Sequence, residues 1–184
     1  MRKALYVMGI LDDEDVEWIA SHGRNLGVQK GDVLIYEGEP VDALFILLDG
    51  SLKVSAGGAQ VATLLSGEIV GEISFVDSRP PSATVTAAQY SHVLAIPRAL
   101  LHAKIETDAW FASRFFRALA IFLADRLRVT TARLASGSGG RSNPLDGDEI
   151  DLDTMDSVSL AAVRFDKLLK RLQHGGTASS DKSA

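Results

Sequence analysis

The stretch that decides the fold reads Gly71-Glu72-Ile73-Ser74-Phe75-Val76-Asp77-Ser78-Arg79-Pro80-Pro81-Ser82-Ala83-Thr84-Val85. A turn-forming glycine and a carboxylate open a short apolar turn, in which residues 73–76 can form one turn of helix with free N–H groups. A stiff, proline-rich loop follows, and a Ser-Ala-Thr-Val run with strand character closes the stretch. The order of these parts predicts a compact unit of turn, loop and strand.

The surrounding residues carry the pattern of many short strands. From 28 to 97, short β-branched runs alternate with glycine turns, among them Gly-Glu-Pro at 38–40, Asp-Gly at 49–50 and Gly-Gly at 57–58. Short strands separated by such turns are typical of a sandwich or barrel. The sequence therefore predicts an antiparallel all-β unit in the middle of the chain.

Four ordered blocks of the chain resemble the cyclic nucleotide-binding domain family, in particular the effector domain of the catabolite activator type. They are the stretch at 71–85 and the blocks at 31–40, 44–54 and 61–68. The resemblance covers roughly residues 28–128. It implies an α+β fold, in which a β-jelly roll at 28–97 is flanked by helices and residues 71–85 form the phosphate-binding cassette.

In this family the Gly-Glu pair of the cassette holds the ribose, and an arginine just before the closing strand holds the cyclic phosphate. The resemblance implies cAMP or cGMP as ligand, no metal, and these ligand-binding residues: Gly71, Glu72, Ile73, Ser74, Arg79, Ser82, Ala83 and Thr84. Glu72 would accept a hydrogen bond from a ribose hydroxyl, and Thr84 would contact a purine. The alternatives are an exposed acid after a turn and an ordinary strand threonine.

Pro81 stands where the family has its phosphate-binding arginine. Proline offers no side-chain donor, no charge and no N–H. Charge-assisted hydrogen bonds contribute about 1.5–3 kcal/mol each, and a loss of about 3 kcal/mol weakens binding roughly a hundredfold. The sequence thus predicts weak or absent cyclic nucleotide binding. Arg79, two residues earlier, is either a replacement cation or a surface charge.

Helical patterns flank the strands. Residues 1–27 are expected to form an N-terminal helical segment, whose main helix is capped by Asp12 or Asp13 and stops at His22-Gly23. Residues 98–135 are expected to form a helical region with a short piece at 98–106 and a long helix at about 108–134.

The long helix carries two apolar lines. The first comprises Phe116, Leu119, Leu123 and Leu127, and the second Phe115, Ala118, Phe122 and Val129. At 1.5 Å per residue this helix overhangs a barrel about 20 Å deep. We expect one line to pack on the jelly roll and the other to pair with a second subunit, with Phe122 or Leu127 near the axis of the homodimer. A broad contact within one monomer is the alternative.

The C-terminal third divides by composition. Residues 136–155 read as a flexible acidic linker, 156–174 as an amphipathic helix and 175–184 as a disordered tail. The basic residues of that helix are expected on a solvated face: Arg164, Lys167, Lys170 and Arg171. The helix either folds back over the long helix or binds an unidentified protein partner. The region is too short and acidic for a winged helix-turn-helix, and with a net charge of −5 we expect a stand-alone effector domain without DNA binding.

Composition narrows the class of protein further. The chain has no cysteine, its four histidines are scattered without metal-ligand spacing, and no nucleophile, base and orienting group occur together. No stretch has the length and apolarity of a membrane span. We therefore expect a cytoplasmic protein that is not an enzyme. Two functions remain: a regulatory sensor that signals through protein contact, and a ligand-independent scaffold or adaptor.

Overall fold

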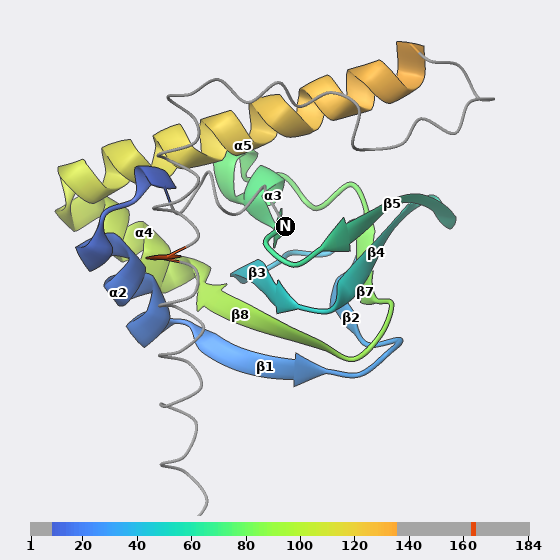
Figure 1. Cartoon of the computed structure of the whole chain (residues 1–184), viewed down its shortest axis with the longest axis horizontal. Coiled ribbons are helices and arrows are strands. Elements are labelled where there is room, and N and C mark those ends of the chain that lie inside the picture. Colours follow the sequence, from blue (N-terminus) through green and yellow to red (C-terminus); the bar gives the residue numbers. More distant parts are fainter. Residues whose placement is uncertain (1–8, 136–162, 165–184) are drawn as a thin grey trace, which may run out of the picture.

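The computed structural model describes residues 9–135 and 163–164, and shows a β-sandwich with helices at one end and along one side (Figure 1). The strands are β1 (Arg24–Val28), β2 (Val33–Ile35), β3 (Ala43–Asp49), β4 (Ser51–Ala56), β5 (Ala59–Leu65), β6 (Ile69–Val70), β7 (Thr84–Ala87) and β8 (Ser91–Pro97). The helices are α2 (Asp13–His22), α3 (Glu72–Asp77), α4 (Arg98–Thr107) and α5 (Ala109–Ala135). This architecture confirms the predicted jelly roll with flanking helices.

The sandwich consists of two four-stranded sheets, ordered β1-β8-β3-β6 and β2-β7-β4-β5, in which all paired strands are antiparallel. β3 is buried on both faces. Leu44, Ile46 and Leu48 belong to the core under the helices, whereas Phe45 and Leu47 belong to the core between the sheets. The first sheet thus lies between the helices and the second sheet. Because β3 is covered on both sides, its sequence is a continuous apolar run.

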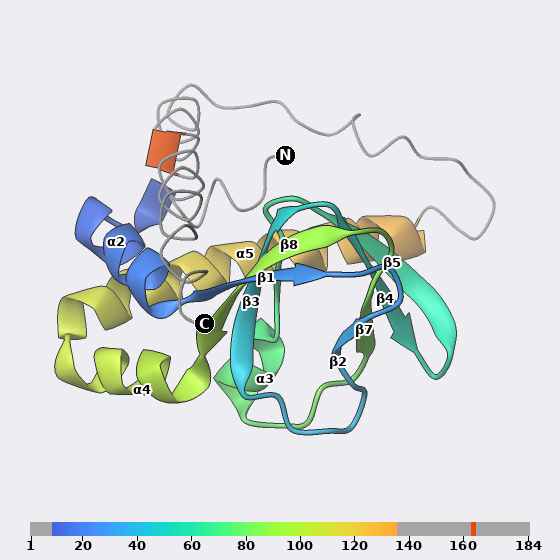
Figure 2. The ribbon, with the colours of Figure 1, turned by 90° about the horizontal axis from the view of Figure 1, so that it is seen from below.

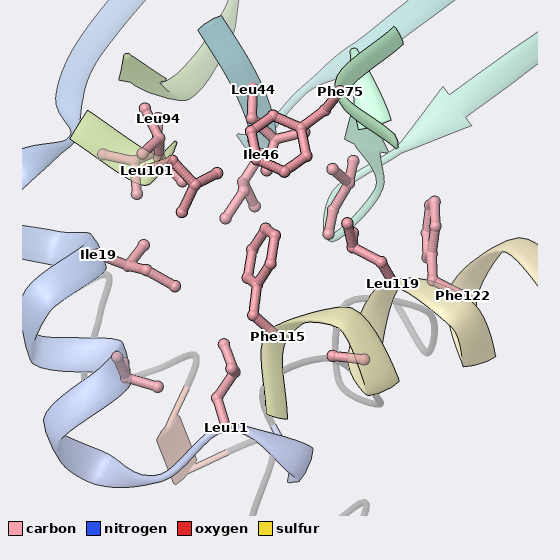
Figure 3. Packing of buried hydrophobic residues seen from close by; sticks show 14 of the residues in the cluster. Leu11, Ile19, Leu44, Ile46, Phe75, Leu94, Leu101, Phe115, Leu119 and Phe122 are labelled. Carbon is pink, nitrogen blue, oxygen red and sulfur yellow. The ribbon is translucent and has the colours of Figure 1, made fainter. Parts of the chain in front are cut away.

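The helices close the outer core. Figures 1 and 2 show α2 and α4 gathered at one end of the sandwich, with α5 running from there past α3. In Figure 3, Phe115 and Leu119 of α5 point toward Ile46 of β3 and Phe75 of α3. The Phe75 and Phe115 rings meet edge to face at 5.8 Å. Each such buried side chain stabilises the fold by about 1.5–3 kcal/mol.

α5 buries one face and leaves another exposed. Phe115, Ala118 and Phe122 of the second predicted line are buried, and so is Leu119 of the first line. By contrast Phe116 is 43% exposed and Leu127 is 67% exposed. Phe122 therefore belongs to the monomer core, and its predicted place near a dimer axis is wrong. Positions 115, 118, 119 and 122 share one helix face because each residue advances about 100°.

The N-terminal helix begins and ends as predicted. Asp12 caps α2 and forms a reciprocal capping box with Asp15, and the N–H of Gly23 donates to the carbonyl of Ile19 at 2.9 Å. A side chain at Gly23 would lie 2.6 Å from Leu94, so packing demands glycine there. The capping box fixes the helix start more sharply than apolar periodicity does.

Three findings differ from or limit the sequence-based expectations. β1 starts at Arg24, so residues 24–27 belong to the sheet and not to the N-terminal helical segment; the strand is exposed and held by backbone pairing with β8, which leaves no alternating pattern. Arg164, expected on a solvated face, is a helical residue whose side chain is only 13% exposed. The rest of the predicted helix at 156–174, the linker at 136–155, the tail at 175–184 and residues 1–8 lie outside the described residues.

Over residues 9–135 and 163–164, no helix has both the length and the apolarity needed to cross a membrane. In the same part of the chain, no three His, Asp or Glu side chains are grouped so that they can hold a metal ion.

Candidate functional site

The cassette begins at Gly71, a position that no residue with a side chain can occupy without strain. Gly71 has φ 88°, in the left-handed region, and a Cβ there would lie 3.0 Å from the carbonyl oxygen of Ala43. Its own carbonyl accepts from the N–H of Phe75 at 3.0 Å, which starts α3. The predicted helical turn at 73–76 is thus present and one residue longer at each end.

Glu72 is the most unusual residue of the cassette, because it is a carboxylate only 1% exposed. Its Oε1 accepts from Nη1 of Arg126 on α5. Nη2 of Arg126 donates to Glu68 Oε2 at 3.1 Å and to the carbonyl of Ile69 at 3.0 Å. The predicted ribose acceptor is therefore joined directly to the long helix.

Burial raises the pKa of Glu72, and the positive charge of Arg126 opposes this effect. A backbone hydrogen bond also lowers the pKa, while the negative charge of Glu68 raises it again, and the net shift is upward. The guanidinium of Arg126 in turn lies over the Phe122 ring, 4.6 Å from its centroid. The ion pair compensates only part of the cost of burying this carboxyl group.

A second arginine fixes the inner face of α3. Ser74 is buried, and its carbonyl accepts from Nη2 of Arg98 at 3.0 Å. Nη1 of Arg98 donates to the carbonyl of Val41 at 3.1 Å, and the guanidinium lies 5.5 Å from the Phe75 ring centroid. Ile73, by contrast, is half exposed on the outer face. Arg98, the first residue of α4, therefore joins the cassette helix to the loop that leads into β3.

The loop and closing strand are held by a neighbouring turn. The N–H of Gly38 donates to the carbonyl of Pro81 at 2.8 Å, and the N–H of Glu37 donates to Thr84 Oγ1 at 3.0 Å. The Glu37 carboxylate accepts from the N–H of Gly57 at 3.0 Å. Thr84 thus already accepts one hydrogen bond in the fold, and its hydroxyl keeps one donor and one further lone pair for a ligand.

The structure gathers some of the predicted site residues and not others. Gly71, Glu72, Ile73 and Ser74 lie together at the start of α3, while Ser82 is exposed and Ala83 half-buried before β7. Arg79 is exposed; its N–H donates to Asp77 Oδ1 at 2.9 Å, and its guanidinium makes no hydrogen bond within the part of the chain that the structure describes. The missing phosphate cation is therefore not replaced by an arginine already held in the cassette.

Two arginines that hold the cassette, Arg126 and Arg98, were not predicted from the sequence. Arg126 had a signal, since it lies four residues after Phe122 and continues the buried line of α5. A charged residue on a core-facing line needs a partner, which is Glu72. Arg98 follows a strand with no such pattern and carries no comparable signal.

Residues 26–108 match the family model described as the cyclic nucleotide-binding domain. A cGMP-dependent protein kinase of Toxoplasma gondii is 38% identical over 73 residues, which are 40% of this chain and 7% of the kinase. An uncharacterized NTE family protein of Mycobacterium tuberculosis is 26% identical over 154 residues, 83% of this chain and 26% of that protein. The chain thus spans about a quarter or less of these two relatives.

Among solved structures, a cyclic nucleotide-binding domain from Methylobacillus flagellatus superposes with a TM-score of 0.64. It is 23% identical, and the match covers 72% of this chain and 78% of that one. At this level of identity the likeness shows the shared fold.

Proposed function

Residues 26–108 belong to the cyclic nucleotide-binding domain family, and on that premise we propose that the protein is a cytoplasmic regulatory sensor for a cyclic nucleotide such as cAMP or cGMP. It signals through contact with another protein and has no catalytic role. The observation that carries the proposal is the direct tie between Glu72 of the cassette and Arg126 of the long helix. A ligand bound at the cassette would contact Glu72, the residue that forms an ion pair with Arg126 of α5.

The tie suggests how binding is coupled to α5. A ribose hydroxyl that donates to Glu72 competes with Arg126 for the same carboxylate, which weakens the ion pair. Arg126 keeps Glu68 and the carbonyl of Ile69 as alternative acceptors. The C-terminal half of α5 then shifts relative to α3, and a partner senses that shift.

The affinity is set by Pro81. With no cation at that position and Arg79 exposed, we expect the protein to bind cAMP and cGMP at best in the high-micromolar range. Calorimetric titration with cAMP, cGMP and cyclic dinucleotides tests this. Pro81→Arg should tighten binding by on the order of a hundredfold. Pro80→Arg is the matched control, because it adds the same charge one residue away and should bind no tighter than wild type.

Nanomolar binding by the unmodified protein would contradict this account of affinity. Arg79→Ala then identifies the cause, since loss of binding in that variant would mean that Arg79 swings in to supply the missing charge.

We also propose a homodimer through the exposed part of the first apolar line of α5, which includes Phe116 and Leu127, with Leu127 near the two-fold axis. Leu127→Asp should give a folded monomer, because the contact would bury an unpaired charge only in the dimer. Light scattering measures the mass, and Leu65→Asp is the control, since Leu65 is similarly exposed but lies on β5. A monomer that dimerises only after truncation at Ser136 would contradict the proposal and make the C-terminal segment the cover of this line.

A ligand-independent scaffold or adaptor is the second candidate. Pro81 favours it, and so does the Glu72 carboxylate, which has an arginine partner within the chain. If neither wild type nor Pro81→Arg binds any nucleotide of the panel, the scaffold is the better assignment.

A further inference from the structure

The turn that leads into α2 receives arginines from two distant parts of the chain. We call residues 9–15 the acidic turn. Arg114 of α5 binds Asp15 through two nitrogens at 2.6 and 2.8 Å and Asp12 at 2.9 Å. Arg164 reaches the same turn from the C-terminal region, and Figure 2 shows residues 163–164, in orange-red, beside the start of α2.

Arg164 contacts both a carboxylate and main-chain carbonyls there. Its Nε donates to Asp13 Oδ1 at 2.8 Å, and its Nη1 donates to the carbonyls of Gly9 at 3.2 Å and Leu11 at 2.5 Å. The carbonyl acceptors belong to Gly9 and to Leu11, whose side chain is buried. The neighbouring Val163 is exposed, whereas the Arg164 side chain is only 13% exposed.

This arrangement is selective for arginine. A guanidinium offers five N–H donors in a fixed plane and can reach separate acceptors at once, whereas an ammonium is a compact point charge. The two carbonyl oxygens can accept hydrogen bonds from any cation, and the Asp13 carboxylate adds a negatively charged acceptor beside them. The acidic turn is therefore a guanidinium-binding site, and its occupant in this structure is Arg164.

We propose that Arg164 is a clasp, which fastens the C-terminal segment to the acidic turn of the same chain and makes that segment compete with any partner arginine for one site. Residues 136–162, at up to about 3.3 Å each, are long enough to bridge any distance within one domain. Arg114 ties the same turn to α5, so a shift of α5 changes the acceptors of the clasp. That last step rests on the proposed function, whereas the clasp itself does not.

Because the chain has no cysteine, two engineered cysteines can be spin-labelled without background. Val163→Cys and Arg117→Cys, both at exposed positions, should give a narrow distribution of inter-spin distances in the full chain. Adding Arg164→Ala should broaden it, and Arg164→Lys should give an intermediate result. Arg128→Ala is the control: it removes an exposed arginine of α5 and should leave the distribution narrow.

Three results would overturn the clasp. One is a broad distribution in the parent chain, and another is a narrow one that Arg164→Ala leaves unchanged. The third, measured with every chain carrying Leu127→Asp so that the proposed dimer does not contribute, is a dipolar signal in a mixture of singly labelled chains, which would place the contact between copies. If Arg164→Ala fails to fold by circular dichroism, the Arg164→Lys variant decides.

A vacant site gives a positive readout. A labelled peptide spanning 156–174 should bind the Arg164→Ala chain and not the wild type, and a peptide with alanine at 164 should bind neither. Equal binding of both peptides to the Arg164→Ala chain would refute a guanidinium site. Failure of the clasp leaves the nucleotide titrations unaffected, so the two proposals fail separately.

Discussion

Two buried carboxylates each meet an arginine of α5, and their pKa values move in opposite directions. For Asp15, burial raises the pKa, but hydrogen bonds from Arg114 and from the N–H of Asp12 outweigh it, so the pKa lies below its ordinary value. For Glu72, burial raises the pKa and Arg126 offsets only part of that effect. The same residue pairing is therefore a fixed structural contact near the start of α5 and a costly one farther along the helix.

The difference has a geometric cause. Arg114 gives both oxygens of Asp15 a donor, and Asp15 also belongs to the capping box of α2. Arg126 instead divides its donors among Glu72, Glu68 and a carbonyl, and Glu68 repels Glu72. The first pair fixes α2 on α5, while the second joins α5 to the cassette with little net gain.

The largest effect is expected from breaking the second pair. Arg126→Ala should lower the free energy of unfolding by about 3 kcal/mol, because it leaves the Glu72 charge buried without a partner. Adding Glu72→Gln should recover part of that loss by removing the charge. Urea denaturation measures both variants, with Arg128→Ala as a control expected within about 0.5 kcal/mol of wild type. A further loss on adding Glu72→Gln would refute the account.

In the Arg114–Asp15 pair, neutralising the carboxylate after removing the arginine should lower the free energy of unfolding further, whereas in the Arg126–Glu72 pair it should raise it. Arg114→Ala should cost about 2 kcal/mol, since Asp15 keeps the N–H of Asp12 as a donor. Adding Asp15→Asn should then lower stability by a further 0.5–1 kcal/mol or so, because a charge at the helix N-terminus remains favourable. If the second substitution restores stability here as well, the two pairs are alike and the comparison is wrong.

The sequence analysis identified local features of the cassette and missed long-range ones. Gly71, Glu72 and Pro81 were recognisable because their spacing lies within one contiguous stretch. The partner of Glu72 lies 54 positions away, and the acceptors of Arg164 are more than 150 positions away. Such contacts depend on how helices pack on the sandwich, which no local pattern records, although Arg126 within a buried line was a usable warning.

The smallest effect concerns acid stability. The folded-state pKa of Asp15 lies below its ordinary 3.8, so the ion pair contributes stability above that value and loses it as the pH falls through the folded-state pKa. Melting temperatures of wild type should therefore drop more steeply below about pH 4 than those of Asp15→Asn. Equal slopes would show that Asp15 does not contribute. The pKa of Glu72 is raised, so this group destabilises the folded state as the pH rises above the ordinary range of a glutamate. The melting temperature of Glu72→Gln should therefore rise relative to that of wild type over the same pH range.

The central claim is that the cassette reports to α5 through Glu72 and Arg126, and hydrogen exchange tests it most directly. The Pro81→Arg variant is compared with and without saturating cAMP or cGMP, after calorimetry has confirmed binding. We predict that amide exchange changes around Arg126 and stays constant around Phe111 and Phe115, where α5 is packed in the core. Nucleotide binding that leaves exchange around Arg126 unchanged would contradict the account.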